Sequence, residues 1–293
     1  MAPSLRARCL NLGAFKLLNV LSGKRARLRS SACHSRSQND NMIISPFATF
    51  VLCFVVLWLS SHAGAYFRKR RGALEQSERD DLAVIVTATL TLLGLVIGFT
   101  FSMAVSRYDL RKNYEEAEAN AIGTEYVRAD LLPSADATKV RALLKSYLDQ
   151  RIRFYVTGGG RELEQINADV AKLQGDLWSN VQAVSEVRPT PVIALAVSGM
   201  NDVLNAQGYT QAAIWNRIPI AAWALMGAIA VCSSLLFGYY TVRAHTGITR
   251  FIFLPLIIAI SFFLIADMDS PRHGVIRVAP QNLISLSHSL SAP

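Results

Sequence analysis

Two aspartates and one arginine lie just after long apolar runs, where the sequence could most readily form an ion pair. Asp267 and Asp269 follow closely on the apolar run 251–266, and Arg107 follows directly on the apolar run 82–106. A lone carboxylate near the centre of a bilayer costs about 2.5–3.5 kcal/mol and less at its boundary, so a nearby cation would stabilise it. The sequence predicts a boundary ion pair between Arg107 and Asp267. The alternative is that both aspartates are solvated among the lipid headgroups.

A row of small and polar residues runs through the apolar run 82–106. Its members are Thr87, Thr91, Gly94, Gly98 and Ser102. Their spacings of 4, 3, 4 and 4 place them along one face of a helix. Two interpretations follow. The row either packs closely against another helix, through the small-xxx-small pair Gly94 and Gly98, or forms the polar wall of a water-filled path.

A second polar group lies beyond the apolar run. It comprises Asn120, Gly123, Glu125, Tyr126 and Arg128. At helical spacing Arg128 reaches Glu125, and the group reads as a solvated, salt-bridged helix face in preference to an ion-binding site.

The remaining reactive residues predict neither a metal site nor an enzyme. The cysteines and histidines are scattered, at Cys9, Cys33, Cys53, Cys232, His34, His62, His245, His273 and His288. They lack the paired spacing of a zinc site or a disulfide framework. The glycine run 158–160 lacks the ending of a phosphate loop, and no nucleophile elbow or nucleotide fingerprint occurs. No cofactor and no catalytic activity are expected.

Composition indicates an integral membrane protein that carries one soluble domain. Hydrophobic residues make up 52% of the 293, and the mean hydropathy is positive. Four apolar segments are expected at 43–61, 82–106, 218–240 and 251–266. The predicted fold is all-α, and its parts are a first transmembrane pair (42–106), a soluble helical domain (107–217), a second pair (218–267) and a tail (268–293).

The second segment is expected to continue without a break into water. From Leu82 to Val105 there is no charge, and charged residues at helical spacing follow as far as Pro133. In the soluble domain, 162–187 repeats apolar residues at intervals of 3 and 4, which predicts a helix packed in a small bundle.

The first 41 residues hold most of the net charge. They carry eight Lys or Arg against the single acid Asp40, so about +7 of the total +9 lies there. We interpret this segment either as a targeting segment or as sequence that precedes a true translation start at Met42. No basic patch interleaved with aromatic residues accompanies this charge to suggest nucleic-acid binding. Counting basic residues near the membrane, with this segment included, places both termini and the soluble domain in the cytoplasm.

The stretch "LLGLVIGFTFSMAVSRYDLRKNYEEAEANAIGTEYVRADLLP" (92–133), together with "IADMDSPRHGVIRV" (265–278), resembles the bestrophin-like domain family of bacterial membrane proteins. The likeness spans about 42–286 in the same order of segments. It implies a multi-pass protein of the bacterial inner membrane, distantly similar to the bestrophin anion channels. Those channels are pentamers whose second transmembrane helix lines the pore, and an acidic calcium-binding run that they carry after the fourth segment is missing here.

On that resemblance, the chain is expected to self-associate and to conduct chloride or another small anion. Phe99 and Phe101 are then candidates for an apolar constriction, with Thr87, Thr91 and Ser102 on the wetter wall. The rival interpretation is a membrane-anchored interaction or regulatory protein whose soluble bundle binds a partner. A transporter is less favoured, because neither a broken helix nor an internal repeat is visible.

Overall fold

The computed structural model of the chain describes residues 46–72, 75–241, 249–272 and 274–291. Within these ranges the backbone forms helices joined by turns and short connections, and no strand occurs. All of them belong to one unit, Ser45–Pro293. The predicted all-α fold is confirmed. The basic segment 1–41 lies outside the described residues.

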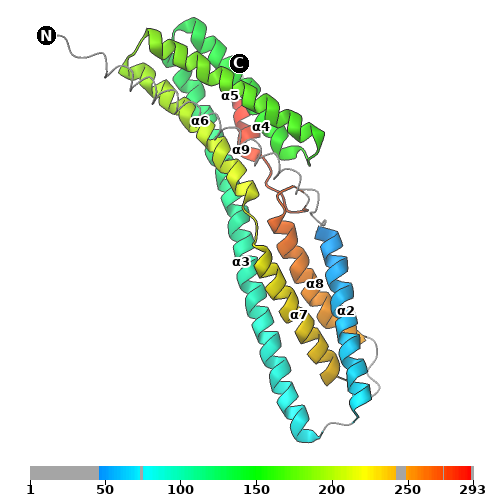
Figure 1. The fold of residues 1–293 in the computed structure, drawn as a ribbon. Coiled ribbons are helices and arrows are strands. Elements are labelled where there is room, and N and C mark those ends of the chain that lie inside the picture. The colour runs from blue at the N-terminus through cyan, green and yellow to red at the C-terminus, as the bar shows by residue number, and fades with distance from the viewer. Residues whose placement is uncertain (1–45, 73–74, 242–248, 273, 292–293) are drawn as a thin grey trace, which may run out of the picture. The chain divides into compact units, whose positions relative to one another are not determined.

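The helices follow one another with short connections (Figure 1). They are α2 (Pro46–Arg71), α3 (Gln76–Arg128), the 3₁₀ turn η2 (Ala129–Leu131), α4 (Ser134–Val156), α5 (Arg161–Val187), α6 (Pro191–Trp215), α7 (Ile220–Tyr240), α8 (Thr249–Asp269) and α9 (Gln281–Ser291). Four stretches are long and apolar enough to cross a membrane: Pro46–Arg71, Gln76–Leu131, Pro191–Tyr240 and Phe251–Asp269. The four predicted segments are confirmed.

Helix α3 connects the two groups of helices. Its 53 residues extend about 80 Å at 1.5 Å per residue, whereas a hydrocarbon core of about 30 Å needs only about 20. No proline interrupts it, and a capping box between Glu75 and Glu78 satisfies its first amides. The helix ends in η2, just before Pro133. The prediction of one unbroken helix that leaves the lipid is confirmed.

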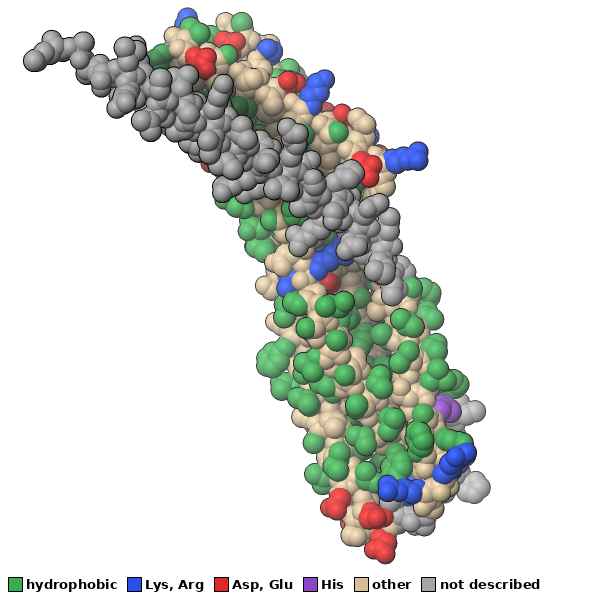
Figure 2. All heavy atoms as spheres, viewed as in Figure 1, with side chains coloured by type: hydrophobic (Ala, Val, Ile, Leu, Met, Phe, Trp, Pro, Cys, Tyr) green, Lys and Arg blue, Asp and Glu red, His purple; other side chains and the backbone are tan. Residues whose placement is uncertain are grey.

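The first group of helices contains α2, α7, α8 and the first half of α3. Helix α2 packs on α7 and α8, and both of these also pack on α3. Hydrophobic side chains cover this part of the visible face, and charged side chains gather at its free end (Figure 2). This distribution suits lipid around the sides and water beyond the end.

The second group consists of α4, α6 and α9, which pack on the second half of α3, and α5, which packs on α4 and α6. Its apolar core is a single cluster to which all of these helices contribute. The predicted seam of α5 is buried in this core at Ile166, Val170, Leu177, Val181 and Val184, with Leu163 and Leu173 partly buried. The bundle is therefore held by apolar burial, as its periodicity predicts.

The tail contains a helix that the sequence analysis did not anticipate. α9 is only 11 residues long, yet it packs on α3 and α4. Leu283 is fully buried in the bundle core, and Leu286 contacts the position of Gly123 on α3. So short a helix is marginal by itself in water, so its stability comes from this packing.

Close helix packing by small residues occurs between α2 and α7. A Cβ atom added at Gly238 would overlap the backbone carbonyl of Ser61, and one added at Gly64 would overlap that of Leu235. Glycine at both positions lets the two backbones approach. Gly227, on the same helix α7, has open space where its side chain would be.

We therefore expect Gly238→Ala to destabilise the protein by about 1–3 kcal/mol, because the added methyl group forces α2 and α7 apart. The thermal unfolding midpoint of the purified protein in detergent measures this effect. Gly227→Ala is the matched control and should leave the midpoint nearly unchanged. Equal midpoints for the two variants would contradict the packing described.

Candidate functional site

The small and polar row of α3 is exposed along its whole length. Thr87, Thr91, Gly94, Gly98 and Ser102 all lie at the surface of the chain. A Cβ atom added at Gly94 or Gly98 would meet nothing within 4 Å. The row therefore does not pack against another described helix of the same chain.

The packing that the sequence analysis weighed for this row was against Gly227, Ser234 and Gly238 of the third segment. Of these residues, Gly238 faces Ser61 of α2, Ser234 is buried, and Gly227 faces open space. None of the three covers the row.

The hydroxyl groups of this row are satisfied by their own helix. Thr87 Oγ1 donates to Ala83 O at 2.8 Å, and Thr91 Oγ1 donates to Thr87 O at 2.8 Å. Such bonds let threonine sit in an apolar medium at little cost, and they leave oxygen lone pairs that can accept from water. The row is compatible with lipid, a neighbouring helix or water.

The exposed side of α3 continues beyond the membrane segment. Its exposed polar members there are Asp109, Asn113, Glu116, Asn120 and Thr124. At about 100° per residue these positions stay within about 40° of Ser102 around the helix axis. One side of α3 is therefore bare from its membrane half to its aqueous half. We call this side, from Thr87 to Thr124, the open face of α3.

Phe99 and Phe101 flank the open face. They are 67% and 39% exposed. Two residues apart on a helix, they point about 160° away from each other, so only one of them can face a given axis.

The structure gives Arg107 and Asp267 separate partners. Arg107 Nη1 donates to Asn216 Oδ1 at 2.9 Å. Asp267 accepts the backbone amides of Val275 and Ile276 at 2.7 and 2.8 Å. Asp267 therefore holds the turn after α8, and the two side chains do not form the predicted ion pair.

Asp269 and Arg111 hold the boundary between the two groups of helices. Asp269 Oδ1 accepts the backbone amide of Ile218, just before α7, at 3.0 Å. Arg111 Nη2 donates to Met268 O, near the end of α8, at 2.8 Å. Both aspartates are buried, so neither is solvated among the headgroups as the alternative prediction supposed.

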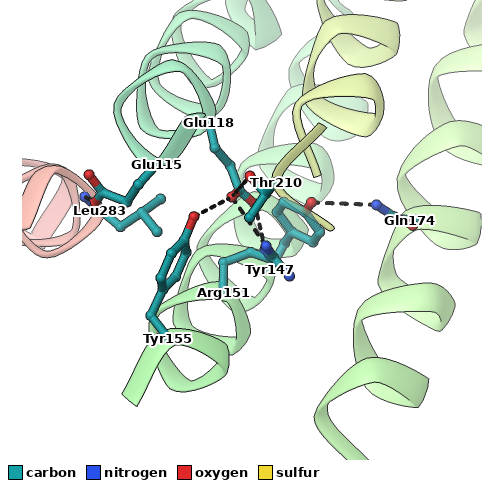
Figure 3. Close-up of polar contacts among 8 residues, drawn as sticks. All are labelled: Glu115, Glu118, Tyr147, Arg151, Tyr155, Gln174, Thr210 and Leu283. Carbon is teal, nitrogen blue, oxygen red and sulfur yellow. Dashed lines mark hydrogen bonds and ion pairs between the residues drawn. The ribbon is translucent and has the colours of Figure 1, made fainter. Parts of the chain in front are cut away.

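A buried polar network joins α3 to α4 and α6 (Figure 3). Arg151 Nε donates to Glu118 Oε1, and Arg151 Nη2 donates to Glu118 Oε2 at 3.2 Å, with both side chains fully buried. Thr210 Oγ1 and Tyr155 Oη also donate to Glu118 Oε2, at 3.1 and 3.4 Å. Three donor groups from two helices therefore surround one carboxylate.

The same network changes the acidity of two tyrosines. Burial and the nearby Glu118 carboxylate raise the pKa of Tyr147 and of Tyr155, and Arg151 opposes the rise. Tyr147 Oη accepts a hydrogen bond from Gln174 of α5 at 3.4 Å. Both phenols stay protonated, so they act here as hydrogen-bonding groups rather than as bases.

Glu115 holds α9 on the bundle. Its carboxylate accepts the backbone amide of Leu283 at 3.0 Å and the side-chain amide of Asn282 at 2.6 Å. These groups lie in the first turn of α9, where amides lack partners within the helix and the helix dipole favours an anion. Figure 3 shows Glu115 beside Leu283.

Glu125 departs from the prediction of a solvated, salt-bridged face. Its side chain is fully buried, and neither carboxylate oxygen has a hydrogen-bond partner. Gly199 of α6 lies against it, where a Cβ atom would overlap Glu125 Oε2. Glu125 lies about 30 Å along α3 beyond Val105, outside the membrane segment. Burial raises its pKa to about 8, with Arg128 opposing the rise and Asp202 adding to it.

The sequence analysis did not single out Arg151, although a signal was present. Val140, Leu144 and Tyr147 are buried on one face of α4, and Arg151 continues their spacing of 4, 3 and 4. A cation on an apolar face needs a buried acceptor. The acceptor is Glu118, which lies 33 residues away from Arg151, so no local sequence pattern connects the two residues.

In the part of the chain that the structure describes, no group of His, Cys, Asp and Glu could hold a metal ion. The two ionised groups of the buried network, Glu118 and Arg151, are paired with each other, and Tyr155 and Thr210 also line a small cavity. The longest exposed polar surface of α3 is its open face, which is neutral in the membrane half and acidic in the aqueous half.

Comparison with known proteins identifies the family. The profile of the bestrophin-like domain matches residues 52–283. Solved structures that match include three mutants of a bacterial bestrophin homologue from Klebsiella pneumoniae, at 11%, 12% and 13% identity and TM-scores of 0.55, 0.57 and 0.55. The matches cover 82%, 82% and 84% of this chain and 98%, 97% and 99% of that chain. At this identity they show the fold alone. No curated protein matches the chain.

We expect Arg151→Met to lower the free energy of unfolding by about 3–5 kcal/mol, because Glu118 is left as a buried charge without its cation. The double variant Glu118→Gln, Arg151→Met should recover most of this loss. Unfolding in detergent, followed by circular dichroism, compares the three proteins. A double variant as unstable as the single one would contradict the pairing.

Glu125 should make stability fall as pH rises. The folded carboxyl stays protonated up to about pH 8, whereas in the unfolded chain it ionises near 4.5. Stability from this group is therefore full below about pH 4.5 and is lost as pH rises through about 8. Unfolding midpoints of the wild type and Glu125→Gln should agree at low pH and diverge as pH rises, with the variant the more stable. Parallel pH profiles would refute the shift.

Proposed function

Because the chain belongs to the bestrophin-like domain family, we propose that it is the subunit of a bestrophin-like anion channel. Several copies assemble so that the open face of each α3 lines a common path. The soluble bundle, the N-terminus and the C-terminus lie in the cytoplasm of the bacterial cell.

The observation that supports this proposal is the solvent exposure of the open face in a single copy. In one copy, the opposite side of α3 packs on α7, α8, α6 and α9, while the open face is exposed along its length and only its last members, Asn120 and Thr124, border α6. A row of threonine, glycine and serine is an unusual surface to present to lipid tails, which favour larger apolar side chains. Other copies or water suit this row better than lipid does.

The membrane half of the open face has features that a conduction path needs. Residues 82–105 carry no ionisable group, so no fixed charge traps a permeant ion there. The threonine oxygens provide a wettable wall. Phe99, the more exposed of the two flanking aromatics, is the candidate for an apolar constriction.

The aqueous half of the open face favours a second candidate function, conduction of cations. Asp109 and Glu116 lie on this side, both exposed, and a ring of subunits would bring several copies of each together. Rings of carboxylates attract cations and repel anions. The sign of the permeant ion is therefore the first property to measure.

The rival to both is a membrane anchor without transport. It requires the open face to be covered by lipid or by a different protein, with the soluble bundle as the functional part. Mass determination of the purified protein is the first test, because a channel of this kind needs a closed ring of copies and a monomer would exclude it.

The direct test is ion flux. The full chain, purified in detergent and shown by mass to be an oligomer, is reconstituted into liposomes, and chloride and potassium fluxes are recorded in parallel. We expect chloride flux several-fold above that of protein-free liposomes. Potassium flux without chloride flux would replace the anion proposal with the cation candidate. An ordered oligomer that passes neither ion would favour the membrane-anchor function over both channel functions.

Thiol modification tests the path itself. In a background with the four native cysteines replaced by serine, Ser102→Cys places a thiol on the open face. Thr100→Cys places one on the buried side, only two residues away. A charged thiol reagent should block flux through Ser102→Cys and leave Thr100→Cys unaffected. Equal sensitivity of the two would exclude the open face as the path.

A further inference from the structure

We propose that the chain binds one small anion of chloride size and charge in a cavity on the buried side of α3. The cavity is about 20 Å³, which is room for a single water-sized occupant. It lies where the membrane group of helices meets the soluble bundle. Its polar lining comes from Arg111, Tyr155, Thr210 and Arg272, and its apolar lining includes Ile214 and Val278.

Arg111 carries the buried positive charge that a bound anion would balance. Its side chain is only 5% exposed. Its Nε donates to Arg107 O at 3.1 Å and its Nη2 to Met268 O at 2.8 Å, and both acceptors are neutral carbonyls. No ion pair within 4.0 Å joins Arg111 to a carboxylate among the described residues. A buried cation whose hydrogen bonds go only to neutral carbonyls has just the Asp269 carboxylate, beyond ion-pair distance, to balance its charge, which is costly at low dielectric.

The charges around Arg111 add to this excess. The ionised side chains close enough to act on it are Arg107, Arg217 and Asp269. Asp269 has one oxygen committed to the backbone amide of Ile218. Two further arginines against one aspartate leave the region around Arg111 positive. A negative occupant would restore the balance, whereas a water molecule would not.

The other polar groups of the cavity do not supply the missing charge. Tyr155 and Thr210 donate to Glu118, whose own charge is compensated by Arg151. Arg272 adds a second guanidinium, which donates to the carbonyls of Phe154 and Thr157 at 2.9 and 3.1 Å. Two guanidiniums therefore line one small cavity.

The size of the cavity selects the occupant. Room for about one water-sized particle favours a halide over a phosphate, a carboxylate ligand or a lipid headgroup. The cavity also lies on the side of α3 opposite the open face, so the bound ion is not on the proposed conduction path. The site holds whether or not the protein conducts ions, and its expected effect is to stabilise the junction between membrane and bundle.

Anion-dependent stability tests the site. The full chain in detergent is unfolded thermally while sodium gluconate is replaced stepwise by sodium chloride at constant ionic strength. Because the anion binds the folded state, the midpoint should rise with chloride, by about 5 °C at a hundred-fold excess over Kd. Bromide should act similarly. A midpoint that does not respond to either halide overturns the proposal.

Three variants locate the effect. Arg111→Gln removes the cation, and Ile214→Phe fills the cavity while keeping the cation; both should abolish the halide dependence. Lys112→Gln is the matched control, because Lys112 is the next residue on α3 but is exposed and does not line the cavity, and it should keep the halide dependence. Halide dependence that survives in Ile214→Phe refutes this location, and that variant decides the matter if Arg111→Gln does not fold.

Crystals grown in bromide give an independent readout. Anomalous scattering should show one bromide beside Arg111 Nη1. A water molecule there, with no anomalous peak, would overturn the proposal whatever the thermal data show.

Discussion

A charged side chain can leave water only where the protein replaces the lost hydrogen bonds and balances the charge, and this constraint shapes the buried side of α3. Three successive charged residues on that side satisfy this constraint, and each does so by contacting a different part of the chain. Arg111 contacts the end of α8, Glu115 holds the first turn of α9, and Glu118 pairs with Arg151 of α4. One helix side therefore joins the membrane group, the C-terminal helix and the bundle. The carboxylate oxygens of Glu125, the fourth such residue, accept no hydrogen bond from the described residues.

The opposite side of α3 follows another rule. The open face is exposed from Thr87 to Thr124, and its character changes along the helix, from neutral and small in the membrane half to acidic in the aqueous half. The buried contacts of α3 described above lie on its other side. A face exposed over such a length in a bestrophin-like protein is the basis of the proposed assembly, and it separates the residues that hold the fold from those proposed to meet ions.

Much of the fold was predictable because it rests on local patterns. Apolar run lengths gave the four segments, the absence of proline gave the unbroken α3, and heptad-like spacing gave the seam of α5. The buried polar contacts were not predictable, because they join residues far apart in sequence. Glu118 and Arg151 look like ordinary helix charges until packing brings them together. The predicted pair of Arg107 and Asp267 fails for the same reason, since backbone amides and an asparagine compete for those side chains. Helix α9 was not predicted because it is only 11 residues long, although Leu283, Leu286 and Leu290 repeat at intervals of 3 and 4.

The central claim is that copies of the chain gather with their open faces toward one another. One measurement tests it most directly: the distances between spin labels in different copies, with one label per chain at position 113 on the open face or at position 179 on the exposed side of α5. The account predicts strong dipolar coupling between copies for label 113, at clearly shorter distances than for label 179. No coupling at position 113, or shorter distances from position 179, would contradict it.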